Sequence, residues 1–330
     1  MLRRRLIAAI PVLIGMSFLV FMLMHLAPGD PVDMLLGEEA VEEDYIRKRH
    51  EWGLDRPLPI QYWEFIRHAF RGDFGHSYKF GDPVLALVKE RLPATIELAL
   101  ASFLVAILLS VPIGVYSATK HNSAWDHAGM TFALMGISVP NFWLGIMLIF
   151  YFGAQLQWLP VSGQIDFSFE VPRWTGFYFI DTLAQRDWPA FWDFLKHLLL
   201  PAVTLGTALA AITARITRSS MLDVIRQDYI MTARAKGLSE QTIIWKHAVR
   251  NALLTVVTIL GLQLGALLSG SVVTETVFSW PGIGRLLIEA ITVRDYKLAQ
   301  GIILFFGTMY IFLNIVVDLL YSLIDPRIRL

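Results

Sequence analysis

The side chains most able to do chemistry are few in this sequence, and they are not arranged for catalysis. There is no cysteine, which excludes thiol catalysis, disulfides and zinc–thiolate sites. No serine lies in a GxSxG nucleophile turn, and no GxxxxGK[ST] phosphate-binding loop is present. The eight histidines form no HExxH motif or other close ligand pair; they are His25, His50, His68, His76, His121, His127, His197 and His247. We therefore predict a protein that is not an enzyme and has no metal site or cofactor of its own.

The most informative chemical feature is a basic segment, residues 228–239, which reads DYIMTARAKGLS between two long apolar stretches. Its alanines favour helix, and Lys236 would complement the negative end of a helix dipole. Gly237 suits a left-handed helix cap, and Ser239 is placed to cap a second helix. The pattern predicts a helix, a glycine turn and a second helix, forming a compact knob that meets something in the cytoplasm. The alternative is a solvated surface element held only by its positive charge.

The residues on either side of this segment extend the hypothesis. Upstream, Met221, Ile225 and Tyr229 recur at a spacing of four, which predicts one apolar stripe on a single polar helix. Downstream, residues 246–254 continue without a break into the next apolar stretch. Because of this continuity, we expect a displacement of the knob to be transmitted into the membrane-spanning part.

The elements that position this segment are predicted to be membrane-spanning helices. The chain has 330 residues, of which 55% are hydrophobic and only 17% charged, and this composition is typical of a polytopic membrane protein. A span needs about 20 mainly apolar residues. Six segments meet this requirement: 6–27, 96–119, 131–154, 198–216, 253–274 and 301–324. Pro140 and Asn141 interrupt the third, so we expect a kink there.

The distribution of lysine and arginine predicts the orientation of these spans. The shorter connections on one side hold most of these residues, which places that side in the cytoplasm together with both termini. The cytoplasmic set comprises Arg3, Arg4, Arg5, Lys120, Arg218, Arg226, Arg234, Lys236, Lys246, Arg250, Arg327 and Arg329. We interpret the first apolar run as a retained helix, because it is long enough to span and lacks a small-residue cleavage pattern. The formal net charge of zero gives no reason to expect nucleic-acid binding.

The predicted organisation has three parts. Residues 1–27 form a cytoplasmic N-terminus and the first span, residues 28–95 form an external loop domain, and residues 96–330 form a five-helix core that includes the cytoplasmic loop 217–252. The loop domain mixes aromatic residues with many charges, which predicts a small folded layer rather than a flexible linker. Its aromatics either pack the layer onto the helices and the headgroup level, or guide a ligand arriving from outside.

Polar residues within and after the fifth span are candidates for a translocation path or gate: Gln263, Ser271, Glu275, Ser279 and Trp280. Gln263 and Ser271 either face a water-filled path or make hydrogen bonds between helices. Residues 275–285 read ETVFSWPGIGR, in which proline and glycines predict a sharp turn at the outer face. Asp318 is an intramembrane acid, for which we expect pairing with a basic side chain near the inner surface.

The string TARAKGL at residues 232–238 resembles the coupling loop, called the EAA loop, of ABC importer permeases and matches its form in the peptide branch of that family. The letters at 231–233 read MTA, so two of the three name-giving residues differ. The resemblance continues in PGDP at 28–31, GLDRP at 53–57, GDFG at 72–75 and in the segment 275–285. It covers almost the whole chain.

This resemblance implies an all-α polytopic membrane protein with the six-helix type I importer fold and an external loop domain after the first helix. It implies translocation of dipeptides or short peptides across the inner membrane of a prokaryote. The implied partners are the lipid bilayer, a second related permease, two ATPase subunits or domains that bind ATP and Mg, and an extracytoplasmic peptide-binding protein. The residues implied to dock on the ATPase are Thr232, Ala233, Arg234, Ala235, Lys236, Gly237 and Leu238.

Two alternatives remain open at this stage. One is a permease of the same fold for another solute, such as a nickel chelate, glutathione or an oligosaccharide. The other is an ion-driven secondary transporter, which calls for inverted repeats and several buried charges at the bilayer midplane.

Overall fold

The computed structural model describes residues 2–26, 29–37 and 41–324, and these ranges are helical without any β-strand. The side chains of residues 1–6, 266, 268–270 and 317–330 lie outside the description, and with them the predictions for Asp318 and the terminal arginines. The chain divides into two compact units, which are described separately. The first contains residues 1–95 and 281–330, and the second contains residues 96–280.

Among the residues that the structure describes, five helices are long and apolar enough to cross a membrane, and a bent helix pair supplies a sixth if it counts as one span. The five apolar segments lie at Ile7–Leu26, Val84–Thr119, Trp188–Ile225, Glu240–Gly265 and Tyr296–Val316. Each predicted span therefore falls on one of these helices or on the pair. The second and fourth helices begin well before the predicted residues 96 and 198, because the helical backbone continues beyond the apolar run into amphipathic sequence.

The bent pair explains the interruption at Pro140. Helix α6 (Ala124–Ser138) and the helix formed by α7 (Asn141–Leu148) and the π-helix η1 (Ile149–Gln155) meet at 102°. Val139 and Pro140 are both extended, with ψ of 123° and 134°. The residue before a proline avoids the helical region, and the proline itself has no N–H for the helix ladder. The kink predicted there is thus a complete break.

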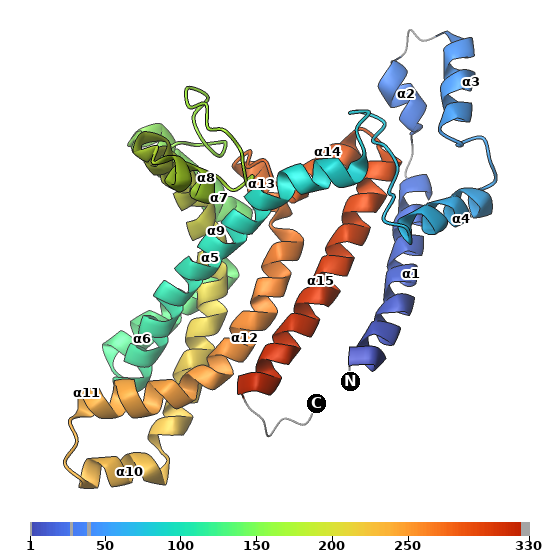
Figure 1. Cartoon of the computed structure of the whole chain (residues 1–330). Helices are drawn as coiled ribbons and strands as arrows, with labels where there is room; N and C mark the ends of the chain where they lie inside the picture. The colour runs from blue at the N-terminus through green and yellow to red at the C-terminus, as the bar shows by residue number, and fades with distance from the viewer. Residues whose placement is uncertain (1, 27–28, 38–40, 325–330) are drawn as a thin grey trace. The chain divides into compact units, whose positions relative to one another are not determined.

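The first unit is built on α1 (Leu2–Leu26), the beginning of α5 (Val84–Thr119), α14 (Ile283–Thr292) and α15 (Tyr296–Ile324) (Figure 1). Its core combines side chains of all four helices, among them Met24, Val88, Leu286 and Ile302. A Cβ atom at Gly301 would lie 2.6 Å from Cγ1 of Val84. Glycine at this position therefore lets α15 approach α5 closely.

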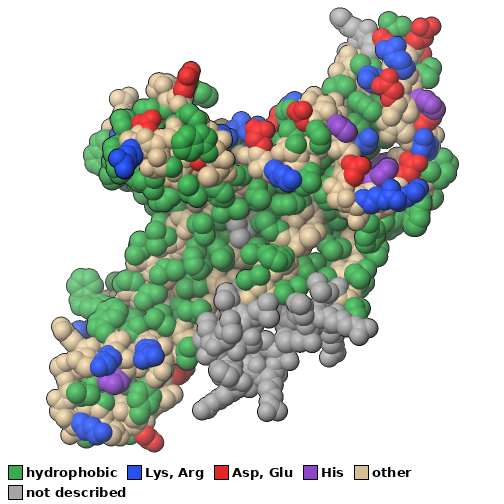
Figure 2. All heavy atoms as spheres, in the orientation of Figure 1, with side chains coloured by type: hydrophobic (Ala, Val, Ile, Leu, Met, Phe, Trp, Pro, Cys, Tyr) green, Lys and Arg blue, Asp and Glu red, His purple; other side chains and the backbone are tan. Residues whose placement is uncertain are grey.

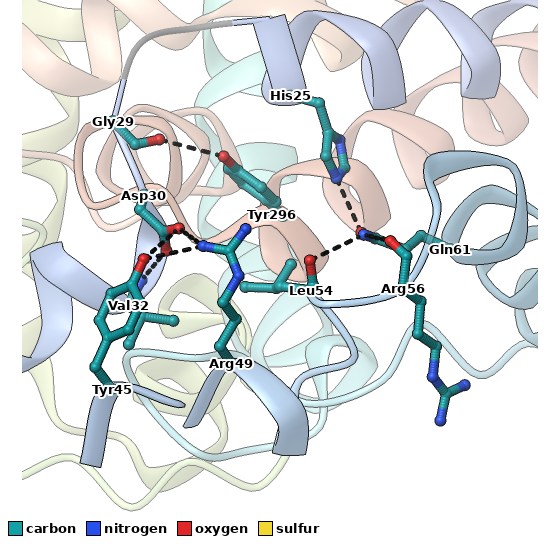
Figure 3. Close-up of polar contacts among 10 residues, drawn as sticks. All are labelled: His25, Gly29, Asp30, Val32, Tyr45, Arg49, Leu54, Arg56, Gln61 and Tyr296. Atoms are coloured by element: carbon teal, nitrogen blue, oxygen red, sulfur yellow. Dashed lines mark hydrogen bonds and ion pairs between the residues drawn. The ribbon is translucent and has the colours of Figure 1, made fainter. Parts of the chain in front are cut away.

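The connection between α1 and α5 folds into three short helices, α2 (Pro31–Leu36), α3 (Glu42–Glu51) and α4 (Leu58–Ala69). Asp30 joins the first two, because its carboxylate caps the Val32 N–H at 2.8 Å and accepts from the Tyr45 hydroxyl at 3.0 Å and from Arg49 (Figure 3). The hydroxyls of Tyr62 on α4 and Ser17 on α1 lie 3.0 Å apart. These contacts make the connection an ordered layer.

The second unit is organised around α9 (Trp188–Ile225), which packs against α6, α7, α8 (Tyr178–Gln185), α12 (Val249–Gly270) and α13 (Val272–Val277). Small residues bring the end of α5 close to α9. A Cβ at Gly206 would meet the Ser102 carbonyl oxygen at 2.8 Å, and one at Gly114 would meet that of Ala214 at 2.7 Å. Such close approach of backbones is a common means of helix association in lipid.

Candidate functional site

The knob, residues 226–248, lies between α9 and α12. It contains α10 (Asp228–Ala235), a turn, the short helix α11 (Glu240–Thr242) and the π-helix η2 (Ile243–Ala248), which runs directly into α12. Within the second unit, α10 and α11 lie at the end opposite to α8 and α13 (Figure 1). The predicted order of helix, glycine turn and second helix is confirmed.

The turn of the knob depends on Gly237. This residue has φ of +77°, a left-handed conformation that costs little only for glycine. Its N–H donates to the Arg234 carbonyl at 2.9 Å, which closes the end of α10. Ser239 then starts the second helix, since its hydroxyl accepts from the Thr242 N–H at 3.4 Å. No atom lies within 4 Å of a Cβ placed on Gly237, so the turn faces open space.

An ion pair bridges the two helices of the knob. The Arg234 guanidinium donates to both carboxylate oxygens of Glu240, at 2.7 and 3.3 Å. The hydrogen bond that Arg234 donates to Glu240 raises the pKa of Arg234 above its ordinary value. Because both side chains are largely exposed, solvent screens the pair, and we assign it an orienting role rather than a large share of the stability.

The inner face of the knob is part of the hydrophobic core of the second unit. Ile230 is fully buried, and Ala233 and Ile243 are also buried. They belong to a cluster that includes Val115 of α5 and Met221 of α9. Ala233 therefore packs inward, whereas the other six residues of the 232–238 string are exposed.

The outer face of the knob combines positive charge with exposed apolar side chains. Figure 2 shows lysine and arginine side chains at this end of the molecule. The exposed basic residues of the knob and its junction with α12 are Arg226, Arg234, Lys236, Lys246 and Arg250. Met231, Leu238 and Trp245 are 55%, 41% and 58% exposed. Apolar anchors within a polar and charged rim are typical of surfaces that bind another protein.

Two of these apolar residues, Met231 and Trp245, were not among the predicted contacts. Which side chains of these short helices are exposed depends on the helix register, and no pattern in the sequence shows that register. The predicted apolar stripe through Met221, Ile225 and Tyr229 is wrong. The helix α9 ends at Ile225, and Gln227 is extended with ψ of 149°. Tyr229 therefore belongs to α10 and does not continue the stripe formed by Met221 and Ile225 on α9.

The predicted path and gate residues lie at and beyond the end of α12. The Gln263 side chain accepts from the Thr213 hydroxyl on α9 at 3.1 Å. Ser271, at the break between α12 and α13, donates to the Glu275 carboxylate at 2.7 Å. Ser271, Glu275 and Trp280 are all buried in this chain. Their part in a path or gate stays a prediction.

The turn after α13 holds the remaining gate candidates. Ser279 has φ of +49°, and the Trp280 N–H returns to the Glu275 carbonyl at 2.8 Å. The Trp280 ring lies 6.3 Å from that of Phe194 on α9. This packing ties the turn to the central helix of the second unit.

A buried carboxylate that the sequence did not single out lies beneath the connection between η1 and α9. Glu97 of α5 accepts from the Gln164 amide at 2.7 Å and from the Phe179 N–H at 2.8 Å. Because these partners are 67 and 82 residues away in the chain, no local pattern reveals the contact. Among the residues that the structure describes, no group of three histidine or acidic side chains is placed to hold a metal.

The comparisons with known proteins agree with this geometry. Residues 110–330 match the family described as the binding-protein-dependent transport system inner membrane component, and residues 1–99 match the N-terminal family of the same transport system. The matched regions cover nearly all of the chain. It belongs to this family of inner membrane transport components, which are permeases of ABC transporters.

Curated relatives extend over almost the full length. The di/tripeptide transport system permease of Pseudomonas aeruginosa (strain UCBPP-PA14) is 46% identical over 327 residues, covering 99% of this chain and 97% of the relative. The dipeptide transport system permease of Escherichia coli (strain K12) is 44% identical over 330 residues with the same coverage. The glutathione transport system permease of Salmonella choleraesuis (strain SC-B67) is 41% identical over 326 residues, again covering 99% and 97%.

Solved structures confirm the type of fold. Two inward-facing forms of the MetNI methionine ABC transporter match with TM-scores of 0.53 and 0.56 at 14% and 15% identity. They cover 73% and 72% of this chain and 97% and 96% of the transporter chains. The predicted all-α permease fold of a type I ABC importer is thereby confirmed.

Proposed function

We propose that this chain is a membrane-spanning subunit of an ATP-driven importer of dipeptides or short peptides. The observation that carries the proposal is the knob: a rigid helix–turn–helix with an exposed cationic and apolar face, bearing the TARAKGL string, in a chain without a phosphate-binding loop. The 44–46% identity to dipeptide and di/tripeptide permeases supports the substrate class.

The partners follow from this role. A second related permease completes the path, two ATPase subunits or domains bind ATP and Mg, and an extracytoplasmic binding protein delivers the peptide. The knob faces the cytoplasm together with both termini, as the lysine and arginine distribution indicates. The lipid bilayer surrounds the spans.

The mechanism uses the continuity of the knob with the spans. Residues of α10 and η2 share one buried cluster with α9 and α12, so a displacement of the knob would be transmitted to these helices through packed side chains. Closure of the ATPases on ATP would displace the knob and, through α12, the break at Ser271 and the turn at Trp280. The path would then change between outward and inward access.

A second substrate has specific support. Glutathione is itself a short peptide, and a glutathione permease is 41% identical over nearly the full chain. The delivered solute is set largely by the binding protein in such systems, so both substrates are compatible with one permease architecture.

The test is uptake by the complete transporter in proteoliposomes. Gly237→Asp and Lys236→Glu should leave insertion intact but reduce peptide uptake at least about tenfold relative to ATP hydrolysis, as expected when an interface loses contacts worth on the order of 1 kcal/mol or more. Gly81→Asp is the matched control, because Gly81 also has a positive φ, +76°, and open space around its Cβ but lies in the other unit. Normal coupling in both knob variants would disprove the docking role.

A further inference from the structure

A cavity of the first unit lies between the layer α3–α4 and the start of α15. Its volume is about 350 Å³, within the usual size range of small-molecule sites. Trp52 and Tyr78 form one wall, with their rings stacked 4.0 Å apart and 14° from parallel. Figure 3 shows part of the rim, where Gln61 joins His25 to the carbonyls of Leu54 and Arg56.

The acidic groups of the cavity are already engaged by the protein. Glu51 accepts from Lys48 at 2.7 Å, Glu64 pairs with Arg56, and Asp73 accepts from the Gly75 N–H at 2.9 Å. These carboxylates are therefore not available as the main ligands of a bound cation.

The histidines of the cavity do not change this conclusion. Both ring nitrogens of His25 are bonded, to the Phe21 carbonyl and to Gln61, and His50 contacts Asp55 at 2.7 Å. His68 and His76 also line the cavity and are exposed to solvent.

Two donors of the cavity, Lys297 and Gln300, come from the first turns of α15. The Gln300 side chain is 3% exposed, and its Nε2 has no hydrogen-bond partner. Among the residues that the structure describes, no carboxylate is at ion-pair distance from Nζ of Lys297, which lies over the Tyr78 ring 5.3 Å from its centroid. Residues three apart share one face of a helix, so Lys297 and Gln300 present an ammonium and an amide donor together.

The local surroundings hold these donors in place. The Lys297 stem lies against Gly75, where a Cβ atom would be only 3.0 Å from Cδ. Asp295, next to the start of α15, is satisfied by the Ser77 hydroxyl and by the Lys79 and Leu298 N–H groups. Burial raises the pKa of the Tyr78 hydroxyl, which therefore stays neutral beside the lysine.

We infer that this cavity binds the free carboxylate of a small ligand, with Lys297 and Gln300 as its donors and the Trp52–Tyr78 wall against the ligand's apolar part. A buried amide without a hydrogen-bond partner and an ammonium without an ion-pair partner are both stabilised when an anionic acceptor joins them. The N-terminal end of α15 adds a positive dipole at the same place. Resting on the proposed function for its identity, the ligand is a short peptide held by its C-terminal carboxylate.

The experiment measures equilibrium binding of glycyl-phenylalanine to the purified transporter in nanodiscs, without binding protein or nucleotide. Saturable binding is expected, and it should be lost when the same dipeptide carries a C-terminal amide. Lys297→Met and Gln300→Leu should each weaken binding about tenfold or more, as expected for a lost charge-assisted or buried hydrogen bond. Lys297→Arg should retain most of it, which separates loss of charge from misfolding.

The control variant is Lys79→Met, because Lys79 is a partly exposed lysine of the same unit, paired with Glu289, and does not line the cavity. Equal binding of the acid and the amide, or unchanged binding in Lys297→Met, would overturn the inference. Uptake assays with the complete system distinguish it from the proposed function. Peptide uptake without binding in the cavity would contradict only the inferred carboxylate site. Binding in the cavity without uptake would contradict only the proposed transport function.

Discussion

At the scale of single residues, one partly buried ion pair ties the bent span to the central helix of the second unit. Asp126, near the start of α6, is 2% exposed and receives two hydrogen bonds from Arg218 of α9, at 2.6 and 2.8 Å. The same carboxylate accepts from the Asn122 N–H at 3.0 Å. Arg218 lies on the part of α9 that leads into the knob.

Removing one partner of this pair should be costly. We predict that Asp126→Ala lowers the free energy of unfolding by about 3 kcal/mol, because it leaves the Arg218 charge without its partner. Thermal unfolding of the purified protein in nanodiscs measures the change. Asp223→Ala, which removes an exposed carboxylate of the same α9, is the control and should have little effect. The double variant Asp126→Leu with Arg218→Leu should recover much of the loss, and failure to do so would contradict the argument.

At the scale of elements, the knob is a structured end of the second unit, with an inner and an outer face of different function. Ile230 and Met231 are neighbours in α10, yet the first is fully buried and the second is 55% exposed. The inner residue connects α10 to α9 and α12, and the outer one is free to meet a partner. A substitution at Ile230 should therefore affect the stability of the knob, and a substitution at the adjacent Met231 should affect docking.

Alanine substitutions at these two positions test the separation. Ile230→Ala should destabilise the knob by roughly 2–4 kcal/mol through loss of buried volume, and hydrogen exchange in residues 226–248 should rise. Met231→Ala should leave exchange unchanged but weaken binding of the isolated ATPase subunits to the reconstituted permease. Similar exchange in both variants would show that the buried face does not hold the knob.

At the scale of the whole molecule, the proposal requires the knob on the ATPase side of the membrane. The natural absence of cysteine makes this simple to test, because single introduced thiols have no background. Leu238→Cys, on the exposed turn of the knob, should react with an impermeant maleimide only from the cytoplasmic side. Phe167→Cys, in the connection after η1, should react only from outside, since Phe167 is fully exposed there. Labelling of residue 238 from outside would reverse the assigned orientation.

Much of the architecture could be predicted from local sequence because its determinants are local. A span is recognised from a continuous apolar run long enough to cross the hydrocarbon core of the bilayer. Gly237 and Ser239 form their helix caps with backbone groups a few residues away. The break at Pro140 likewise follows from the chemistry of one ring. The family resemblance rested on strings of the same local kind.

The membrane class, the spans and the helix–turn–helix of the knob were all predictable from the sequence, because interactions between near neighbours set them. The tertiary structure alone decided that Ala233 packs inward, that Asp126 meets Arg218 ninety-two residues away, and that Lys297 and Gln300 share a cavity with Trp52. The physical reason is that burial and pairing depend on which distant helices come together. Which face of a helix is buried, and against which other helix, therefore cannot be predicted from the sequence of that helix alone.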